Sequence, residues 1–166
     1  MRTPIYIRKF MGEDFRKTQG VDQHFIMWNP KNNVYCADFA DKVKSKRGCY
    51  IISATARSFE YANGRKSPIL YIGLSDNLYK RLHDDHFVKH LKHLIDNRNY
   101  GLEDPNIIRQ MQDKYQYMYY AGARVDIFYC KGVQNQKEFE SRLIAKFYET
   151  YRSMPVGNGA RSFSQK

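Results

Sequence analysis

Two short runs of β-forming residues, joined by a polar loop that contains Asn63-Gly64, constrain the fold of this chain more than any other feature. The runs cover residues 49–56 and 68–73. Residues of this type favour strands, and an Asn-Gly pair favours a tight turn between them. We therefore predict an antiparallel hairpin with a long connection, against which the rest of the chain must pack.

The stretch after the hairpin is amphipathic, but its apolar positions do not keep one helical phase. Leu78 and Leu82 are one turn apart, whereas Phe87 begins a different phase. A kink or break near residues 84–85 would account for the change. We expect the N-terminal cap of this helix at Ser75 or Asp76.

Two further helices and a third strand complete the pattern. Asp104-Pro105 is a typical helix start, and Gly122 is expected to end that helix. Residues 125–129 are rich in β-formers, and Asn135 with Glu138 is expected to begin a last long helix. The order strand, strand, helix, helix, strand, helix predicts an α+β fold, with a small central antiparallel β-sheet flanked by helices.

The first part of the chain is basic. We expect residues 1–47 to form an N-terminal extension that packs on or beside a core of residues 48–166, within one globular unit. The extension carries a predicted short strand at residues 5–7 and a turn at Asn29-Pro30. A cationic cluster follows, which either grips nucleic acid or is a solvated face. Its members are Lys42, Lys44, Lys46 and Arg47.

The net charge favours a polyanionic partner. Lys and Arg number 28 against 17 Asp and Glu, which gives a formal net charge of +11. Such an excess attracts nucleic acid and makes binding sensitive to salt, although it would also keep a protein in solution. No apolar run qualifies as a signal peptide or a membrane span, so no membrane and a cytoplasmic location are expected. The three widely spaced cysteines indicate neither a disulfide framework nor a cysteine zinc site.

Glu140 is the most informative single residue, because it lies within the apolar stripe of the last helix. Leu143, Ile144 and Phe147 belong to the same stripe. An ionised carboxylate is costly to bury alone, so it normally pairs with a cation or binds a metal. A buried Glu–Arg pair is the structural alternative, and Arg81 on the first helix would supply the cation.

Five short elements, which begin with Gly48-Cys49-Tyr50 and Tyr71-Ile72-Gly73, resemble the motifs of the GIY-YIG nucleases, in the order in which that family has them. Gly48-Cys49-Tyr50 is similar to the first motif, with Cys in place of Ile, and Tyr71-Ile72-Gly73 matches the second. Arg81 falls eight residues after Gly73, where the family has its catalytic arginine. Residues 140–144 resemble the E-x-x-L-I segment, and residues 155–158 resemble the closing P-x-x-N.

The resemblance implies a metal-dependent endonuclease that hydrolyses phosphodiester bonds in DNA, either restriction-like or encoded by a phage or mobile element, with RNA not excluded. Glu140 would hold Mg²⁺, for which Mn²⁺ can substitute, and Arg81 would bind phosphate oxygens. Tyr50 would be the general base, and Tyr71 would hydrogen-bond the water or the metal shell. A phenol has a pKa of about 10, so neighbouring cations would need to lower it. Asn158 would organise the site.

The chain departs from the family pattern in three places. The loop between the two tyrosine motifs is longer than usual, as in restriction-type members. Leu74 stands where many relatives carry Lys or another polar residue. The family often has a histidine one helical turn after the arginine, but in this chain that position is Asp85. His86, the next residue, is therefore the candidate for this catalytic role. Ser75 and Lys80 are the candidates to replace the phosphate contact missing at position 74.

Other functions stay open on the sequence alone. The first is a nucleic-acid-binding module that keeps this fold but has lost catalysis, at which Leu74 and the displaced histidine hint. The second is a cysteine hydrolase that uses Cys49 and a histidine, although no characteristic spacing of these residues supports it. A third question is whether a stripe of histidines binds a transition metal or is a polar strip facing DNA. The stripe is His83, His86, His90 and His93.

Specificity needs a source within the chain, because 166 residues leave no room for a separate DNA-binding domain beside the nuclease core. Sequence preference would come from insertions in the core or from a homodimer on a palindromic site.

Overall fold

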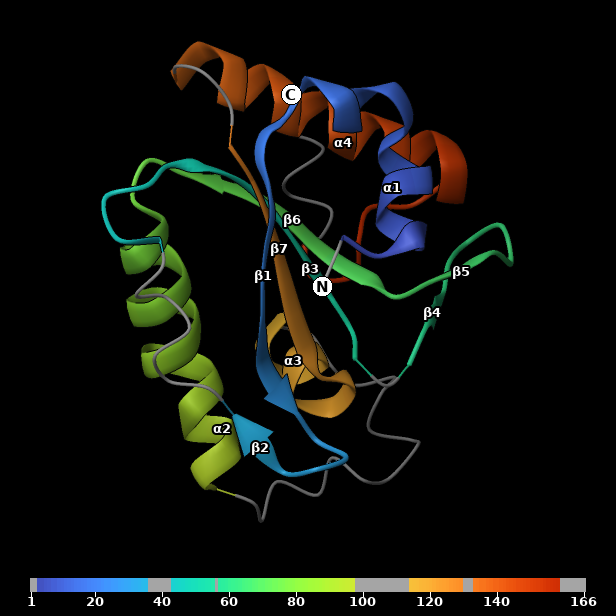
Figure 1. The fold of residues 1–166 in the computed structure, drawn as a ribbon. Helices are drawn as coiled ribbons and strands as arrows, with labels where there is room; N and C mark the ends of the chain where they lie inside the picture. The colour runs from blue at the N-terminus through green and yellow to red at the C-terminus, as the bar shows by residue number, and fades with distance from the viewer. Residues whose placement is uncertain (1–2, 36–42, 56, 98–113, 130–132, 159–166) are drawn as a thin grey trace.

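A five-stranded antiparallel sheet forms the centre of the protein (Figure 1). The structure is a computed structural model and describes residues 3–35, 43–55, 57–97, 114–129 and 133–158. The strand order is β2-β1-β7-β3-β6, so that β6 lies at one edge. The strands are β1 (Gln19–Asn29), β2 (Val34–Tyr35), β3 (Gly48–Ser53), β6 (Ile69–Ser75) and β7 (Ala123–Tyr129).

The predicted hairpin is confirmed as β3 and β6. Gly48 lies opposite Ser75 and Ile51 opposite Ile72, so the two strands pair along most of their length. Their connection contains a small second ribbon, β4 (Phe59–Glu60) with β5 (Lys66–Ser67). Every residue of β3 is buried, because β6 and β7 flank it and helices cover both of its faces.

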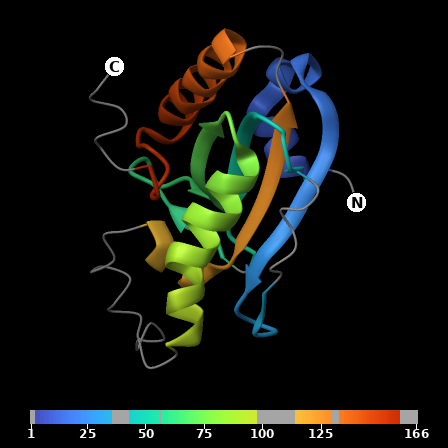
Figure 2. The ribbon, with the colours of Figure 1, turned by 90° about the vertical axis from the view of Figure 1, so that its left-hand side faces the viewer.

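Helices cover both faces of the sheet (Figures 1 and 2). Neighbouring residues of a strand point to opposite faces, and Cys49 and Tyr50 show which helix lies on which face. The Cys49 Sγ donates to the Gln136 carbonyl in α4 (Val133–Tyr151) at 3.3 Å. The Tyr50 hydroxyl lies 2.8 Å from His86 in η3 (Lys80–Leu91). The sheet therefore separates α4 from η3.

The remaining helices extend these two layers. Helix α1 (Ile5–Met11) lies with α4, since Phe10 packs edge-on against Phe147 at a centroid distance of 5.8 Å. A short 3₁₀ turn, η1 (Gly12–Lys17), leads from α1 to β1. Helices α2 (Lys92–Asp96) and α3 (Lys114–Ala121) lie on the η3 side. The predicted α+β class, an antiparallel sheet flanked by helices, is thus confirmed.

The N-terminal part of the chain contributes to the sheet itself. Strand β1 pairs with β7, with Phe25 opposite Val125. The predicted turn at Asn29-Pro30 is confirmed, because the Asn29 side chain accepts a hydrogen bond from the Lys31 N–H at 3.1 Å. The predicted strand at residues 5–7 is wrong. These residues begin α1, whose buried positions Ile7, Phe10 and Met11 follow helical spacing and outweigh three residues of alternation.

Two helix starts also differ from prediction. Asn77 rather than Ser75 or Asp76 caps the helix that begins at Leu78, since the Asn77 Oδ1 accepts the Lys80 N–H at 3.1 Å. Helix α4 begins at Val133, two residues before the predicted start. Gly122 ends α3 as predicted, with φ of 89° and its N–H donated to the Met118 carbonyl at 2.8 Å. The start predicted at Asp104-Pro105 lies outside the described residues.

The helix that follows β6 is continuous from Leu78 to Asp96, so the predicted kink or break near residues 84–85 is wrong. Its central part, Lys80–Leu91, is a π-helix, in which hydrogen bonds join residues five apart. The π-helical pattern extends to Lys92, whose N–H donates to the Phe87 carbonyl five residues earlier. At the end of the helix the pattern is α-helical, because the Asn97 N–H donates to the His93 carbonyl four residues earlier. Each turn of a π-helix is wider than a turn of an α-helix, so Leu82 and Phe87, five residues apart, lie on the same apolar face. Both side chains are fully buried.

No helix in the described part of the chain is long and apolar enough to cross a membrane.

Candidate active site

The two motif tyrosines meet because of Gly73. Tyr50 on β3 lies directly opposite Gly73 on β6, and the rings of Tyr50 and Tyr71 are 5.9 Å apart. A Cβ atom at position 73 would lie 2.7 Å from the Tyr50 Cζ and hydroxyl and 2.7 Å from the Tyr71 Cε1. Because Gly73 of the Tyr-Ile-Gly motif has no side chain, both rings fit into the space beside it. Tyr50 is fully buried, whereas Tyr71 is half-buried.

The π-helix brings His86 to these tyrosines. His86 is five residues after Arg81, and five residues is the spacing that backbone hydrogen bonds join in a π-helix. Its Nε2 lies 2.8 Å from the Tyr50 hydroxyl, and its ring is 5.7 Å from that of Tyr71. His86 rather than Asp85 therefore lies beside the tyrosines, and Asp85 forms ion pairs with Arg81 at 3.8 Å and Lys89 at 3.2 Å.

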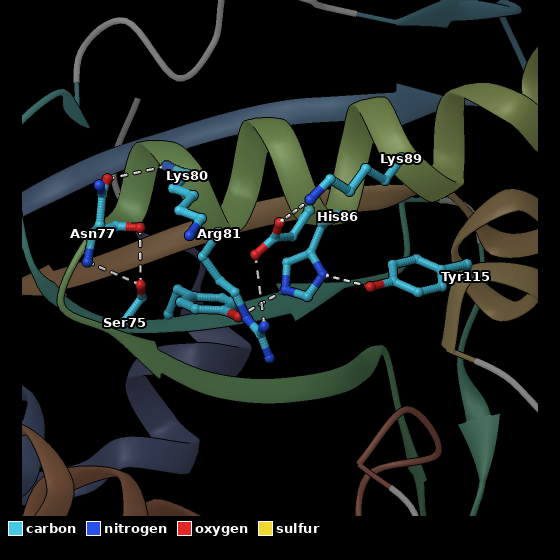
Figure 3. A network of polar contacts seen from close by, with 9 residues as sticks. Ser75, Asn77, Lys80, Arg81, His86, Lys89 and Tyr115 are labelled. Carbon is cyan, nitrogen blue, oxygen red and sulfur yellow. Dashed lines mark hydrogen bonds and ion pairs between the residues drawn. The ribbon is translucent and has the colours of Figure 1, made fainter.

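His86 is neutral in the folded protein. Its imidazole is fully buried, and burial lowers its pKa to about 3, with the cations of Lys114 and Arg81 acting in the same direction. Its second nitrogen, Nδ1, lies 3.0 Å from the Tyr115 hydroxyl (Figure 3). Both ring nitrogens therefore have a phenol as partner.

Arg81 supplies a permanent positive charge beside the tyrosines. Burial alone would lower the pKa of Arg81, but the adjacent Tyr50 and Tyr71 hydroxyls raise it overall. Burial also raises the pKa of Tyr50 well above its ordinary value, and Tyr71 adds to this rise while Arg81 opposes it. The cation that was expected to lower the pKa of Tyr50 is present, but desolvation outweighs it. With 42% of its side chain exposed, Arg81 can also reach a ligand from solvent.

An open cleft of about 320 Å³ lies beside Arg81, at the beginning of η3. Both residues proposed to replace the contact missing at Leu74, Ser75 and Lys80, lie on its wall. Main-chain and side-chain bonds among Ser75, Asn77 and Lys80 shape this wall (Figure 3). The lining residues are Leu74, Ser75, Asp76, Asn77, Lys80, Arg81 and Asp85.

Part of the cationic cluster lies next to the same helix start. The Lys46 carbonyl accepts the Leu78 N–H at 3.0 Å, and the Lys44 Nζ lies 5.4 Å from the centre of the Tyr79 ring. Lys44, Lys46 and Arg47 are all exposed. Lys42 lies outside the described residues.

Glu140 lies on α4, on the other side of the sheet from η3. It is half-buried on a helix whose Leu143 and Ile144 are buried, whereas Glu138 and Glu149 are exposed. Within the described ranges, no group of three or more His, Cys, Asp or Glu side chains could hold a metal ion. Mg²⁺ accepts one or two carboxylates completed by water and phosphate oxygens, so a site built on Glu140 fits Mg²⁺ but not a fully protein-ligated metal.

Asn158 binds the free edge of β6. Its Oδ1 accepts the Ile72 N–H at 2.9 Å, and its Nδ2 donates to the Ile72 carbonyl at 2.8 Å. The Gly157 N–H donates to the Leu70 carbonyl at 2.7 Å, and a Cβ at Gly157 would lie equally close to that oxygen. The closing segment therefore pairs with the strand that carries Tyr71.

Two of the alternatives disagree with the geometry. Among the described residues, no three of these histidines form a group that could hold a metal ion: His83 bonds to Asp84 at 2.8 Å, His86 lies between Tyr50 and Tyr115, and His90 stacks on Tyr115 at 4.2 Å. The π-helix destroys the common face that the 3-4-3 spacing would have in an α-helix. Cys49 lies on the α4 side of the sheet and His86 on the η3 side, so they do not form a cysteine–histidine pair.

Sequence reasoning missed Lys114 and Tyr115. Lys114 places its Nζ 4.6 Å from the centre of the Tyr71 ring, and Tyr115 contacts His86. Tyr115 appears in the sequence only as one position of an amphipathic helix, and no local spacing relates it to residues 50–86. Packing of α3 against η3 creates the contact.

Comparisons with family models, with curated proteins and with solved structures give no match to this chain.

Proposed function

We propose that the protein is a metal-dependent endonuclease of the GIY-YIG type that hydrolyses phosphodiester bonds in DNA. One observation carries the proposal: Tyr50, Tyr71, Arg81 and His86, which belong to three separate elements, gather around a single buried hydroxyl. A buried histidine and an arginine directed at two phenols have no evident role in stability alone. The order of the five motifs along the chain agrees with the proposal.

Proton transfer from the attacking water would involve Tyr50 and His86 together. Because its pKa is raised, Tyr50 does not supply a free phenolate at neutral pH. Neutral His86, 2.8 Å away, would accept the phenol proton while the phenol oxygen takes one from water. A pKa of about 3 makes His86 a weak base, so this transfer requires Arg81, whose charge adds to burial in lowering that pKa, to move toward the phosphate. The hydroxide so formed attacks phosphorus and the bond to the leaving oxygen breaks. The leaving oxygen takes a proton from solvent, and His86 releases the proton that it accepted to solvent.

Arg81 would bind the scissile phosphate. Its guanidinium is charged at every relevant pH, and its planar donors match two phosphate oxygens. Arg81 lies beside the Tyr50 hydroxyl, and its side chain is more exposed to solvent than that of Tyr50. Movement of Arg81 toward a phosphate in the cleft would expose buried Tyr50 to the water that it must activate.

Glu140 would hold the metal. It lies across the sheet from Arg81, so a phosphate contacted from both sides would have to lie at the edge of the sheet formed by β6. When bound, Mg²⁺, or Mn²⁺ in its place, neutralises charge on the phosphate and on the leaving oxygen. The half-buried carboxylate needs water and substrate oxygens to complete such a site, so metal binding would depend strongly on the presence of DNA.

The exposed cations near the start of η3 would bind the nucleic-acid backbone. Lys44, Lys46 and Lys80 lie at the beginning of the helix that carries Arg81, and Arg47 follows Lys46 in the chain. Contacts to phosphates position a duplex without reading its sequence. RNA offers the same phosphates, and a homodimer on a palindromic site would provide the specificity that one small domain lacks.

Plasmid cleavage with paired glutamate variants tests the proposal. Wild-type protein should cut supercoiled DNA with Mg²⁺ and not with EDTA. Glu140→Gln should abolish cutting while binding persists, whereas Glu149→Gln, which removes the same charge from an exposed site on the same helix, should cut normally. Equal activity of the two variants would refute the assigned role of Glu140.

A second candidate is a binding module of the same fold without catalysis. The complete burial of Tyr50 and the apolar Leu74 in the cleft wall favour it. Wild-type protein that binds the plasmid but never cuts it, with either Mg²⁺ or Mn²⁺, would establish this alternative and refute the nuclease.

A further inference from the structure

Tyr115 contacts the nitrogen of His86 that the proposed proton transfer does not use. Its hydroxyl lies 3.0 Å from Nδ1, while Tyr50 lies 2.8 Å from Nε2. Helix α3, which carries Tyr115, also packs on β6, so this contact does not depend on η3 alone. His90 stacks on the Tyr115 ring, with 4.2 Å between centroids and 11° between planes. The phenol is therefore held in place on one face as well as at its hydroxyl.

The surroundings of Tyr50 select one tautomer of His86. A neutral imidazole carries one proton, so one ring nitrogen donates and the other accepts. The Tyr50 oxygen faces the guanidinium of Arg81, which can only donate, and the Tyr71 hydroxyl, which can donate to it as well as accept. The Tyr50 hydroxyl proton is then best directed at Nε2. In this arrangement Nδ1 carries the imidazole proton and donates it to the Tyr115 oxygen.

We infer that Tyr115 is a positioning residue, whose phenol oxygen accepts the Nδ1–H of His86 and so keeps the Nε2 lone pair on Tyr50. The catalytic consequence rests on the proposed nuclease function. The tautomer itself is a property of the resting protein and can be measured whether or not the protein cuts DNA.

A phenol at this position differs from a carboxylate in its effect on the charge of His86. An anion beside Nδ1 would stabilise the imidazolium and raise the pKa of His86. Tyr115 accepts the hydrogen bond without adding negative charge, so His86 stays neutral. The groups that face His86 are the cations Lys114 and Arg81, the carboxylate of Asp85, the imidazole of His90, and the phenols of Tyr50, Tyr71 and Tyr115.

Nuclear magnetic resonance of protein labelled with ¹⁵N-histidine tests the inference directly. Two-bond ¹H–¹⁵N correlations distinguish a protonated from an unprotonated ring nitrogen, and the His86→Gln variant identifies which signals belong to His86. At pH 7 we expect His86 to be protonated at Nδ1 and unprotonated at Nε2. A His86 protonated at Nε2 in the wild type would overturn the inference.

Tyr115→Phe provides the second arm, because it keeps the ring that stacks on His90 and removes only the hydroxyl. It should convert the single tautomer of His86 into a mixture, whereas Tyr117→Phe, a half-buried hydroxyl on the same helix, should leave it unchanged. An unchanged His86 pattern in folded Tyr115→Phe would refute the positioning role. Retained chemical-shift dispersion shows that a variant is folded.

Cleavage rates separate this inference from the proposed function. If the wild type cuts DNA, Tyr115→Phe should lower kcat by at least about tenfold with little change in KM, since an acid–base step is impaired and phosphate binding is not. An unchanged kcat would refute the catalytic consequence. If the wild type never cuts, the nuclease proposal fails, and the tautomer measurement still decides the role of Tyr115.

Discussion

The buried neutral His86 should make the fold sensitive to mild acid, and His86→Gln should remove that sensitivity. The pKa of His86 falls from 6.5 to about 3 on folding, because burial disfavours the charged ring and Lys114 and Arg81 add to the effect. Below pH 6.5 the unfolded chain binds a proton that the folded protein rejects. Stability due to this group is therefore complete above pH 6.5 and declines as the pH falls toward 3.

The expected magnitude follows from the same two pKa values. Within this window each pH unit changes the free energy of unfolding by about 1.4 kcal/mol, so the wild type should lose about 2 kcal/mol between pH 7 and pH 5 through His86 alone. Glutamine keeps a polar side chain but does not titrate. The variant will differ in stability at every pH because its hydrogen bonds differ, and only its pH dependence bears on the argument.

Urea unfolding at pH 7, 6, 5 and 4 measures the effect. Subtracting the His86→Gln curve from that of the wild type removes the groups common to both, including Asp126, whose pKa is raised by burial. His93→Gln, which changes an exposed imidazole, is the matched control and should follow the wild type. Parallel curves for the wild type and His86→Gln would show that His86 is not held neutral, and the proposed proton acceptor would be lost with it.

Three further results are expected. Gly73→Ala should destabilise the fold by about 1–3 kcal/mol in urea unfolding, because its Cβ would lie 2.7 Å from the buried Tyr50 ring; a loss below about 0.5 kcal/mol would contradict that packing. Asn158→Ala removes two hydrogen bonds to Ile72 and should accelerate exchange of the Ile72 amide, and unchanged exchange would show that the closing segment does not protect the β6 edge. Lys80→Ala should reduce the slope of log K against log salt for DNA binding by about 0.9 if Lys80 neutralises one phosphate, and an equal slope would exclude that contact.

Local patterns predicted the elements that lie close together in the sequence. The hairpin of β3 and β6 was predictable because strand formers flank a turn, and its register explains why Gly73 must follow Tyr71 by two residues. Glu140 was singled out by helical spacing alone, and its half-buried position agrees with that reasoning. Strand β1 was missed, because its place beside β7 depends on pairing with residues about a hundred positions away.

The π-helix could not be anticipated in the same way. A change of apolar phase between Leu82 and Phe87 is visible in the sequence, but it is equally compatible with a kink, a break or a wider turn. The wider turn directs Leu82, His86 and Phe87 inward, and these three side chains are fully buried, with His86 between Tyr50 of the sheet and Tyr115 of α3. An isolated helix would have no reason to adopt it, because α-helical bonding is the more stable local choice.

Strand and helix periodicity, turn chemistry and motif order thus belong to the chain itself, since each depends on residues within a few positions of one another. They suffice for the α+β class, for the hairpin and for the identity of Tyr50, Tyr71, Arg81 and Glu140 as candidates. The placement of His86 one π-turn from Arg81 and the contact of Tyr115 with His86 exist only in the folded protein. Both arise because burial of side chains from distant segments selects a helix geometry and a hydrogen-bond partner that no local preference favours.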